Sequence, residues 1–156
     1  MSVATKNVTV DTGYRKASGA LLDELKAAHD KLLGAIATLA ALTGSTIPSR
    51  AEVINARWAI SRASLARRQL WNQIYTHFSG FASEAKQVEL QRLRDADRAL
   101  LGLSVAHVAK WQMDILLRDW STYCQESEAI RWKMKAAIGA EKRILYPMLR
   151  AAASLA

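Results

Sequence analysis

The residues of this chain that could do chemistry stand at positions where a helix would turn them inward. Each continues an apolar stripe at a spacing of three, four or seven residues, which is the repeat of the buried face of a helix. Because they come from four separate segments, they could converge in the core of a helical protein. These candidates are His29, Arg57, Arg67, His107, Asp114 and Glu141.

Three kinds of chemistry fit this set. The first is a buried polar network in which Arg57 or Arg67 pairs with a carboxylate, because a lone buried charge is costly. The second is a metal site with His29, His107 and Glu141 as ligands and Asp114 as a further candidate. The third is general acid–base catalysis by the same side chains. Opposite charges on facing helices favour the network.

The local spacing argues against a metal site and against catalysis. A di-iron carboxylate bundle repeats Glu-x-x-His on two helices, but the positions three residues before the histidines hold Lys26, Ile74 and Ser104. Inward arginines would also repel a divalent cation. The sequence has no nucleophile motif and no phosphate-binding loop. We therefore expect a protein that is not an enzyme and needs no cofactor, with iron as the alternative.

The elements that must position these residues are four long helices. Of the 156 residues 51% are hydrophobic and only seven are glycine and two proline, which excludes a disordered or collagen-like chain and disfavours a β-sandwich. Apolar spacing predicts helices over residues 16–43, 50–77, 83–124 and 126–153, the long third one bent or broken near Gly102. Short links predict an all-α, antiparallel up-down-up-down four-helix bundle.

Smaller signals refine this architecture. We expect Ser49 and Ser83 to cap the second and third helices, and Pro147 to kink the fourth. Residues 1–15 are polar and contain a turn signal, which predicts a flexible N-terminal arm before a single helical-bundle domain of residues 16–156. The seam of the first helix is formed by Leu22, Leu25, His29, Leu32, Ile36 and Leu39.

Two stretches of the chain resemble the hemerythrin-like cation-binding domain family. Residues 25–33 (LKAAHDKLL) resemble its helix with an early histidine followed by leucines, and residues 138–149 (IGAEKRILYPML) resemble its helix end with an acid before Leu-Tyr-Pro. The resemblance implies an antiparallel bundle, which in metal-binding members holds a di-iron centre, and matches His29 and Glu141 to ligand positions. The family's histidine four residues before the glutamate is here Ala137. The chain therefore resembles a divergent member that lacks most metal ligands.

The charge balance points to an acidic partner. The formal net charge is +8, which favours binding to acidic surfaces, and the last predicted helix interleaves cations with apolar residues. Basic pairs occur without any nucleic-acid-binding motif, so we expect a protein partner, with a second copy of the chain as another candidate. The predicted partner surface is formed by Arg131, Trp132, Lys133, Lys135, Lys142 and Arg143.

Cysteine use and hydropathy indicate the compartment. Cys124 is the only cysteine, which is typical of a reducing environment. The longest strongly apolar stretch, residues 32–42, is shorter than the ~20 residues that cross a bilayer, and no signal peptide is visible. The sequence thus predicts a cytoplasmic, non-enzymatic regulatory or protein-interaction module. The alternative is an iron- or oxygen-binding sensor with an incomplete ligand set.

Overall fold

The chain folds into helices joined by short links. The computed structural model describes the backbone of residues 2–46 and 48–154, and the side chains of residues 12–46 and 48–154. No strand occurs within these ranges, as the sequence predicts. The helices are α1 (Ser2–Thr43), α2 (Arg50–Phe78), α3 (Glu84–Lys110), α4 (Met113–Arg118) and α5 (Trp120–Ser154).

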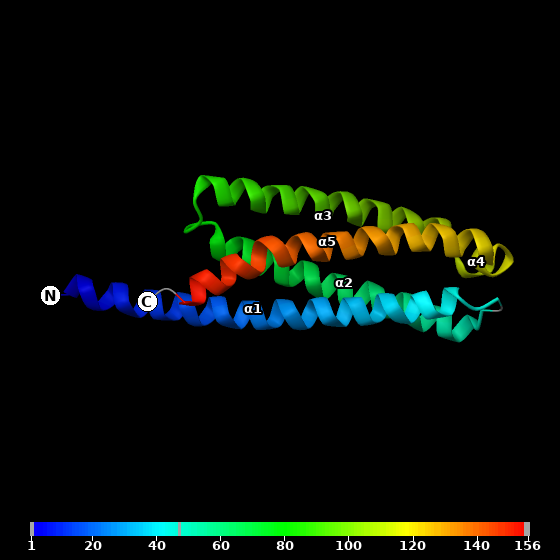
Figure 1. The fold of residues 1–156 in the computed structure, drawn as a ribbon, viewed down its shortest axis with the longest axis horizontal. Helices are drawn as coiled ribbons and strands as arrows, with labels where there is room; N and C mark the ends of the chain where they lie inside the picture. Colours follow the sequence, from blue (N-terminus) through cyan, green and yellow to red (C-terminus); the bar gives the residue numbers. More distant parts are fainter. Residues whose placement is uncertain (1, 47, 155–156) are drawn as a thin grey trace.

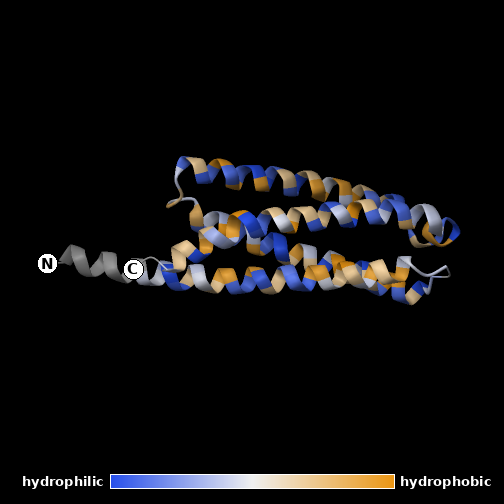
Figure 2. Cartoon of the chain, viewed as in Figure 1, coloured by the Kyte–Doolittle hydropathy of each residue, from blue (hydrophilic) through white to orange (hydrophobic). Residues whose placement is uncertain are grey.

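The four long helices lie lengthwise beside one another, with the short α4 at one end (Figure 1). α1 packs against α2 and α5, and α3 packs mainly against α5. Polar and apolar residues alternate along each described helix (Figure 2), so each helix has one face for the core and another for solvent. None of the described helices is both long and apolar enough to span a membrane.

The predicted seam of the first helix is confirmed. All of its residues are buried on α1, including the polar His29. The expected caps are also confirmed: Ser49 accepts a hydrogen bond from the backbone N–H of Glu52, and Ser83 accepts one from that of Lys86. Such caps satisfy backbone donors that the first turn of a helix leaves free. Pro147 lies within α5 as predicted.

Three helix boundaries differ from the sequence prediction. The first helix begins at Ser2 rather than near Lys16. Most side chains of the predicted arm, residues 1–15, lie outside the described part of the chain. The flexibility of this arm therefore stays a prediction. The third helix does not break near Gly102, which is helical and has open space where a side chain would lie. It ends instead at Lys110, because Trp111 leaves the helical conformation with φ −102° and ψ 64°.

Trp111 determines where the chain turns. Its indole is buried against Tyr123, and its Nε1–H donates to the carboxylate of Glu126 at 2.6 Å. Burying the indole there takes the backbone out of α3, and α4 and α5 follow after the break. α5 therefore begins at Trp120, earlier than the predicted start near Glu126.

The core is divided into three apolar clusters along the bundle. The terminal cluster includes Leu25, Leu70 and Leu145, and lies toward the C-terminal ends of α2 and α5. The central cluster includes Leu32 and Ile138. The turn cluster, formed by Val53, Trp111, Leu116 and Tyr123, lies beside α4. Five of the six candidate polar residues lie near the boundaries between these clusters; the exception is Asp114, which is exposed.

Candidate functional site

A layer of paired charges separates the terminal cluster from the central cluster. We call it the paired layer, and each of its members lies one helical turn from an apolar residue of both clusters. Glu141, for example, lies between Ile138 of the central cluster and Leu145 of the terminal cluster. One residue comes from each long helix. The paired layer consists of His29 on α1, Arg67 on α2, Asp97 on α3 and Glu141 on α5.

Glu141 is the centre of the paired layer. Its Oε1 accepts an N–H of Arg67 at 2.5 Å, and its Oε2 lies 2.7 Å from Nε2 of His29. The second Nη of Arg67 donates to Asp97 at 2.5 Å. His29 has 0% of its surface exposed, and Arg67 and Glu141 are also buried. The layer is therefore a continuous chain of charge-assisted hydrogen bonds across the core.

Tyr146 completes this chain on the other side of His29. Its hydroxyl oxygen lies 2.6 Å from Nδ1 of His29. Burial, and then the carboxylates of Asp30 and Glu141, raise the pKa of Tyr146, so the phenol keeps its proton. A carboxylate beside Arg67 accepts hydrogen bonds only, so Nε2 of His29 carries the proton that faces it. The Tyr146 hydroxyl and Nδ1 form the second hydrogen bond of the His29 ring.

The structure brings together three of the six predicted core residues: His29, Arg67 and Glu141. Asp97 was missed, although it lies four residues after Leu93 and three before Leu100, the same spacing that marked the other candidates. It stands among many charged residues of α3, which concealed the pattern. Its second oxygen is 3.7 Å from Nε of Arg68, an ion pair too long for a hydrogen bond.

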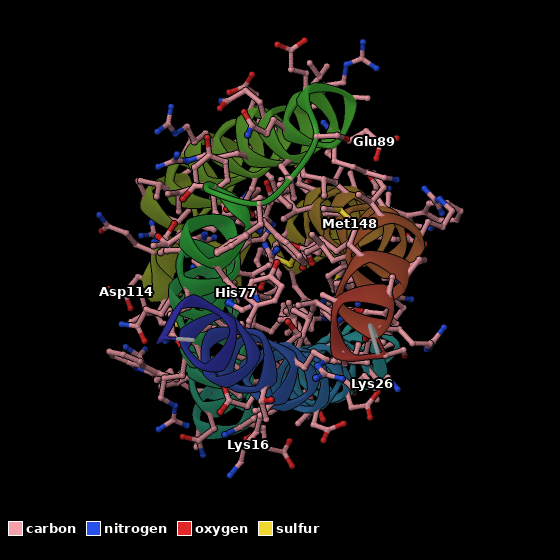
Figure 3. The ribbon with its side chains drawn as sticks, turned by 90° about the vertical axis from the view of Figure 1, so that its left-hand side faces the viewer. Lys16, Lys26, His77, Glu89, Asp114 and Met148 are labelled. Carbon is pink, nitrogen blue, oxygen red and sulfur yellow. The ribbon has the colours of Figure 1, made fainter. Side chains whose placement is uncertain are left out.

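Asp114 was wrongly predicted to point inward. Asp114 follows His107 by seven residues, a spacing that places two side chains on one face only within a continuous helix. The helix ends before Trp111, so this spacing does not predict where Asp114 points. Asp114 lies in the first turn of α4, with 75% of its side chain exposed, and pairs with Arg50 at 3.3 Å. Figure 3 shows it at the outer edge of the bundle.

A second polar layer, between the central cluster and the turn cluster, contains Arg57, His107 and Arg131. We call it the cationic layer. His107 stacks on Tyr123, and the guanidinium of Arg57 lies 5.8 Å from the centre of the same ring. Burial lowers the pKa of His107, and the charge of Arg57 lowers it further, against a smaller opposing effect of Glu126. Arg57 and His107 thus belong to a different site from Glu141.

The structure places one residue of the predicted partner surface in the core and the others at or near the surface of α5. Arg131 is only 7% exposed, so its assignment to the surface is wrong: the face of α5 that carries Ser127 and Met134 is turned inward, and Arg131 lies on it. Trp132 is 70% exposed. The remaining predicted residues are exposed or half-buried on α5; they are Lys133, Lys135, Lys142 and Arg143.

A further histidine site lies near the N-terminal part of the described side chains. His77 stacks on Tyr14, with ring centres 4.2 Å apart, and its Nε2 lies 2.7 Å from the hydroxyl of Ser18. In Figure 3 His77 lies within the outline of the bundle, next to α1. Burial lowers the pKa of His77 and raises that of Tyr14.

The paired layer does not fit an iron centre. Both oxygens of Glu141 are already bonded, one to a guanidinium and the other to His29, so a cation would have to displace the histidine and lie beside Arg67. His107, the third predicted ligand, is in the cationic layer. Among the side chains that the structure describes, no three or more His, Cys, Asp or Glu are grouped as a metal site.

Comparison of the chain with models of known protein families, with curated proteins and with solved structures found no match. The resemblance of residues 25–33 and 138–149 to hemerythrin-like domains therefore stays a prediction.

Replacing Glu141 by glutamine should destabilise the protein strongly. The change removes the charge between Arg67 and His29 and leaves the buried guanidinium with Asp97 alone. Breaking a buried pair in this way lowers the free energy of unfolding by about 3–5 kcal/mol, measurable by urea denaturation. Glu128→Gln, at an exposed position of the same helix, is the matched control and should change it by less than about 0.5 kcal/mol. Equal effects of the two variants would contradict a structural role for the paired layer.

Mild acid should destabilise the fold through His77 and His107. Burial lowers the pKa of both in the folded state, so below the unfolded value of about 6.5 the unfolded chain binds more protons and stability falls. We expect the melting temperature to decrease as the pH falls from about 7.5 to about 5.5, above the range in which carboxylates titrate. The double variant His77→Gln/His107→Gln should flatten this dependence. An unchanged slope would show that other groups cause it.

Proposed function

We propose that this chain is a non-enzymatic, cytoplasmic regulatory or protein-interaction module. Its core would be an antiparallel up-down-up-down bundle, a divergent relative of hemerythrin-like domains in which a protein cation has taken the place of a metal. The observation that carries this proposal is the carboxylate of Glu141, whose two oxygens are bonded to Arg67 and His29. In the paired layer the guanidinium of Arg67 balances the charge of Glu141, a carboxylate that would otherwise be free to bind a metal ion.

Burial of the same residues supports a structural role over catalysis. A general acid or base must come within hydrogen-bond reach of its substrate. His29 is fully buried, and each of its ring nitrogens is already within hydrogen-bond distance of a protein oxygen. A substrate would have to open the core to reach it. The paired layer instead joins the four long helices at one level and fixes their relative positions.

The outer surface of α5 supports a partner-binding role. Trp132 is exposed beside Lys133 and Lys135, and Trp58 on α2 is 62% exposed. Exposed tryptophans are uncommon on a surface that meets only water, and tryptophan is enriched at the centres of protein interfaces. The lysines would steer an acidic protein toward this surface. A second copy of the chain is the alternative partner.

Elemental analysis of the purified protein tests the core of this proposal. We expect a colourless, fully helical protein without stoichiometric iron, whose melting temperature does not change after dialysis against a chelator. A protein that purifies with about one or two iron atoms per chain, shows a visible absorbance band and loses stability with the chelator would overturn the proposal in favour of the sensor. Circular dichroism on the same sample confirms that the protein is folded.

Quantitative affinity purification tests the surface. The triple variant Trp132→Ser/Lys133→Glu/Lys135→Glu should lose a set of acidic proteins that the wild-type chain retains from an extract of the cells that produce it. Lys31→Glu, at an exposed position of α1, is the matched charge control and should retain them. Loss of the same proteins from both variants, or from neither, would contradict a specific role of this part of α5.

A further inference from the structure

The cationic layer carries positive charge without a buried acid to balance it. In the paired layer, Arg67 faces two carboxylates. In the cationic layer, no carboxylate within the described residues forms an ion pair with Arg57 or Arg131. Glu126, whose charge acts on His107, is bonded to Lys110 and to the indole of Trp111. The charges of one polar layer are therefore paired with opposite charges, and the other layer has an excess of cations.

Arg131 is the most unusual member of the cationic layer. It is buried, and within the described part of the chain its hydrogen bonds go only to uncharged oxygens: Nε donates to the carbonyl of Ser127 at 3.2 Å, and Nη2 donates to the hydroxyl of Thr43 at 3.2 Å. Removing a charge from water costs several kcal/mol unless an opposite charge or a set of good hydrogen bonds offsets it. Two neutral acceptors offset only part of that cost, so the site favours an anion.

A cavity of about 480 Å³ lies beside these cations. It is bounded mainly by α2, α3 and α5, and its size is within the usual range of about 300–1,000 Å³ for small-molecule sites. Arg57, His107 and Arg131 line it. Two further lining atoms, Nε of Arg68 and the hydroxyl oxygen of Ser104, are buried and have no hydrogen-bond partner. Such unsatisfied buried groups are rare in folded proteins and call for an explanation.

The rest of the cavity wall is apolar. Leu39, Ile60 and Met134 contribute buried side chains of the central cluster, while Leu101 and Val105 are exposed and lie on the α3 side. A small inorganic anion would pair with the cations but leave these apolar side chains against water. A neutral apolar molecule would cover them but leave the arginines without a counter-ion. Only a molecule with both features satisfies the whole lining.

We propose that this cavity binds a small amphipathic carboxylate, with its head between Arg57 and Arg131 and its apolar body against the central cluster. The carboxylate supplies the missing negative charge and accepts hydrogen bonds from the two guanidinium groups. The neutral imidazole of His107 adds a further donor without adding charge. This site lies apart from the exposed residues of the proposed partner surface and meets the paired layer only through Arg68, which lines the cavity and lies 3.7 Å from Asp97. The proposal can therefore be tested separately from the proposed function.

Calorimetric titration with dodecanoate, at concentrations below micelle formation, tests the proposal. We expect one molecule to bind per chain and the melting temperature to rise with dodecanoate concentration. Arg131→Met should weaken binding by about tenfold to a hundredfold, the usual effect of losing a hydrogen bond to a charged group. Arg57→Met, at a half-buried position, should weaken it in the same direction and serves if the Arg131 variant does not fold. Arg62→Met, at an exposed position of α2 outside the cavity, should leave affinity unchanged.

Two further probes separate the parts of the proposal. Dodecanol has the same apolar body without the charge, and inorganic phosphate has charge without the body; both should bind at least about tenfold more weakly than dodecanoate. Equal binding of dodecanol would show that the arginines play no part, and equal binding of phosphate would show that the apolar wall plays none. Either result, or dodecanoate binding that is the same in both cavity variants, would overturn the proposal. So would the absence of any dodecanoate binding.

Discussion

The pairing of Glu141 with Arg67 is the interaction on which the arrangement of the helices depends. A charge at the centre of a helical core is costly unless its partner lies at the same level with the correct geometry. Glu141 reaches Arg67 on α2 and His29 on α1, and Arg67 continues to Asp97 on α3. Apolar side chains can slide past one another at small cost, but these bonds break if any of the four helices shifts by one turn. The paired layer thus defines the register that the apolar clusters alone leave open.

The two polar layers differ in how far their buried charges are paired. Both lie between apolar clusters and both contain a buried arginine. In the paired layer both oxygens of Glu141 and both ring nitrogens of His29 lie within hydrogen-bond distance of a partner, and Nε of Arg67 has none. In the cationic layer the arginines line an open cavity instead of facing carboxylates. Completeness of pairing therefore distinguishes a structural layer from one suited to binding.

Much of the architecture could be predicted from the sequence, because α1, α2 and α5 each repeat apolar residues at helical spacing. The same spacing identified His29, Arg67 and Glu141 as inward residues, and opposite charges on separate helices suggested their pairing. Asp97 could not be singled out, since α3 is rich in charges and only the fold shows which of them faces Arg67. The break at Trp111 was invisible for a similar reason. It results from burial of an indole against Tyr123, a contact between residues that no local pattern connects.

Burial is unevenly shared among the helices, and this has a consequence for motion. Three residues of α3 are buried, Leu90, Leu93 and Leu100, in a helix of 27 residues, whereas α2 buries residues along its whole length. Local opening follows the contacts that must be broken, so the free energy for detaching an element is smallest where burial is smallest. α3 is accordingly the helix that separates most readily from the rest. Since it also forms one wall of the cavity, its fluctuations provide an entry route to the interior that leaves α1, α2 and α5 in place.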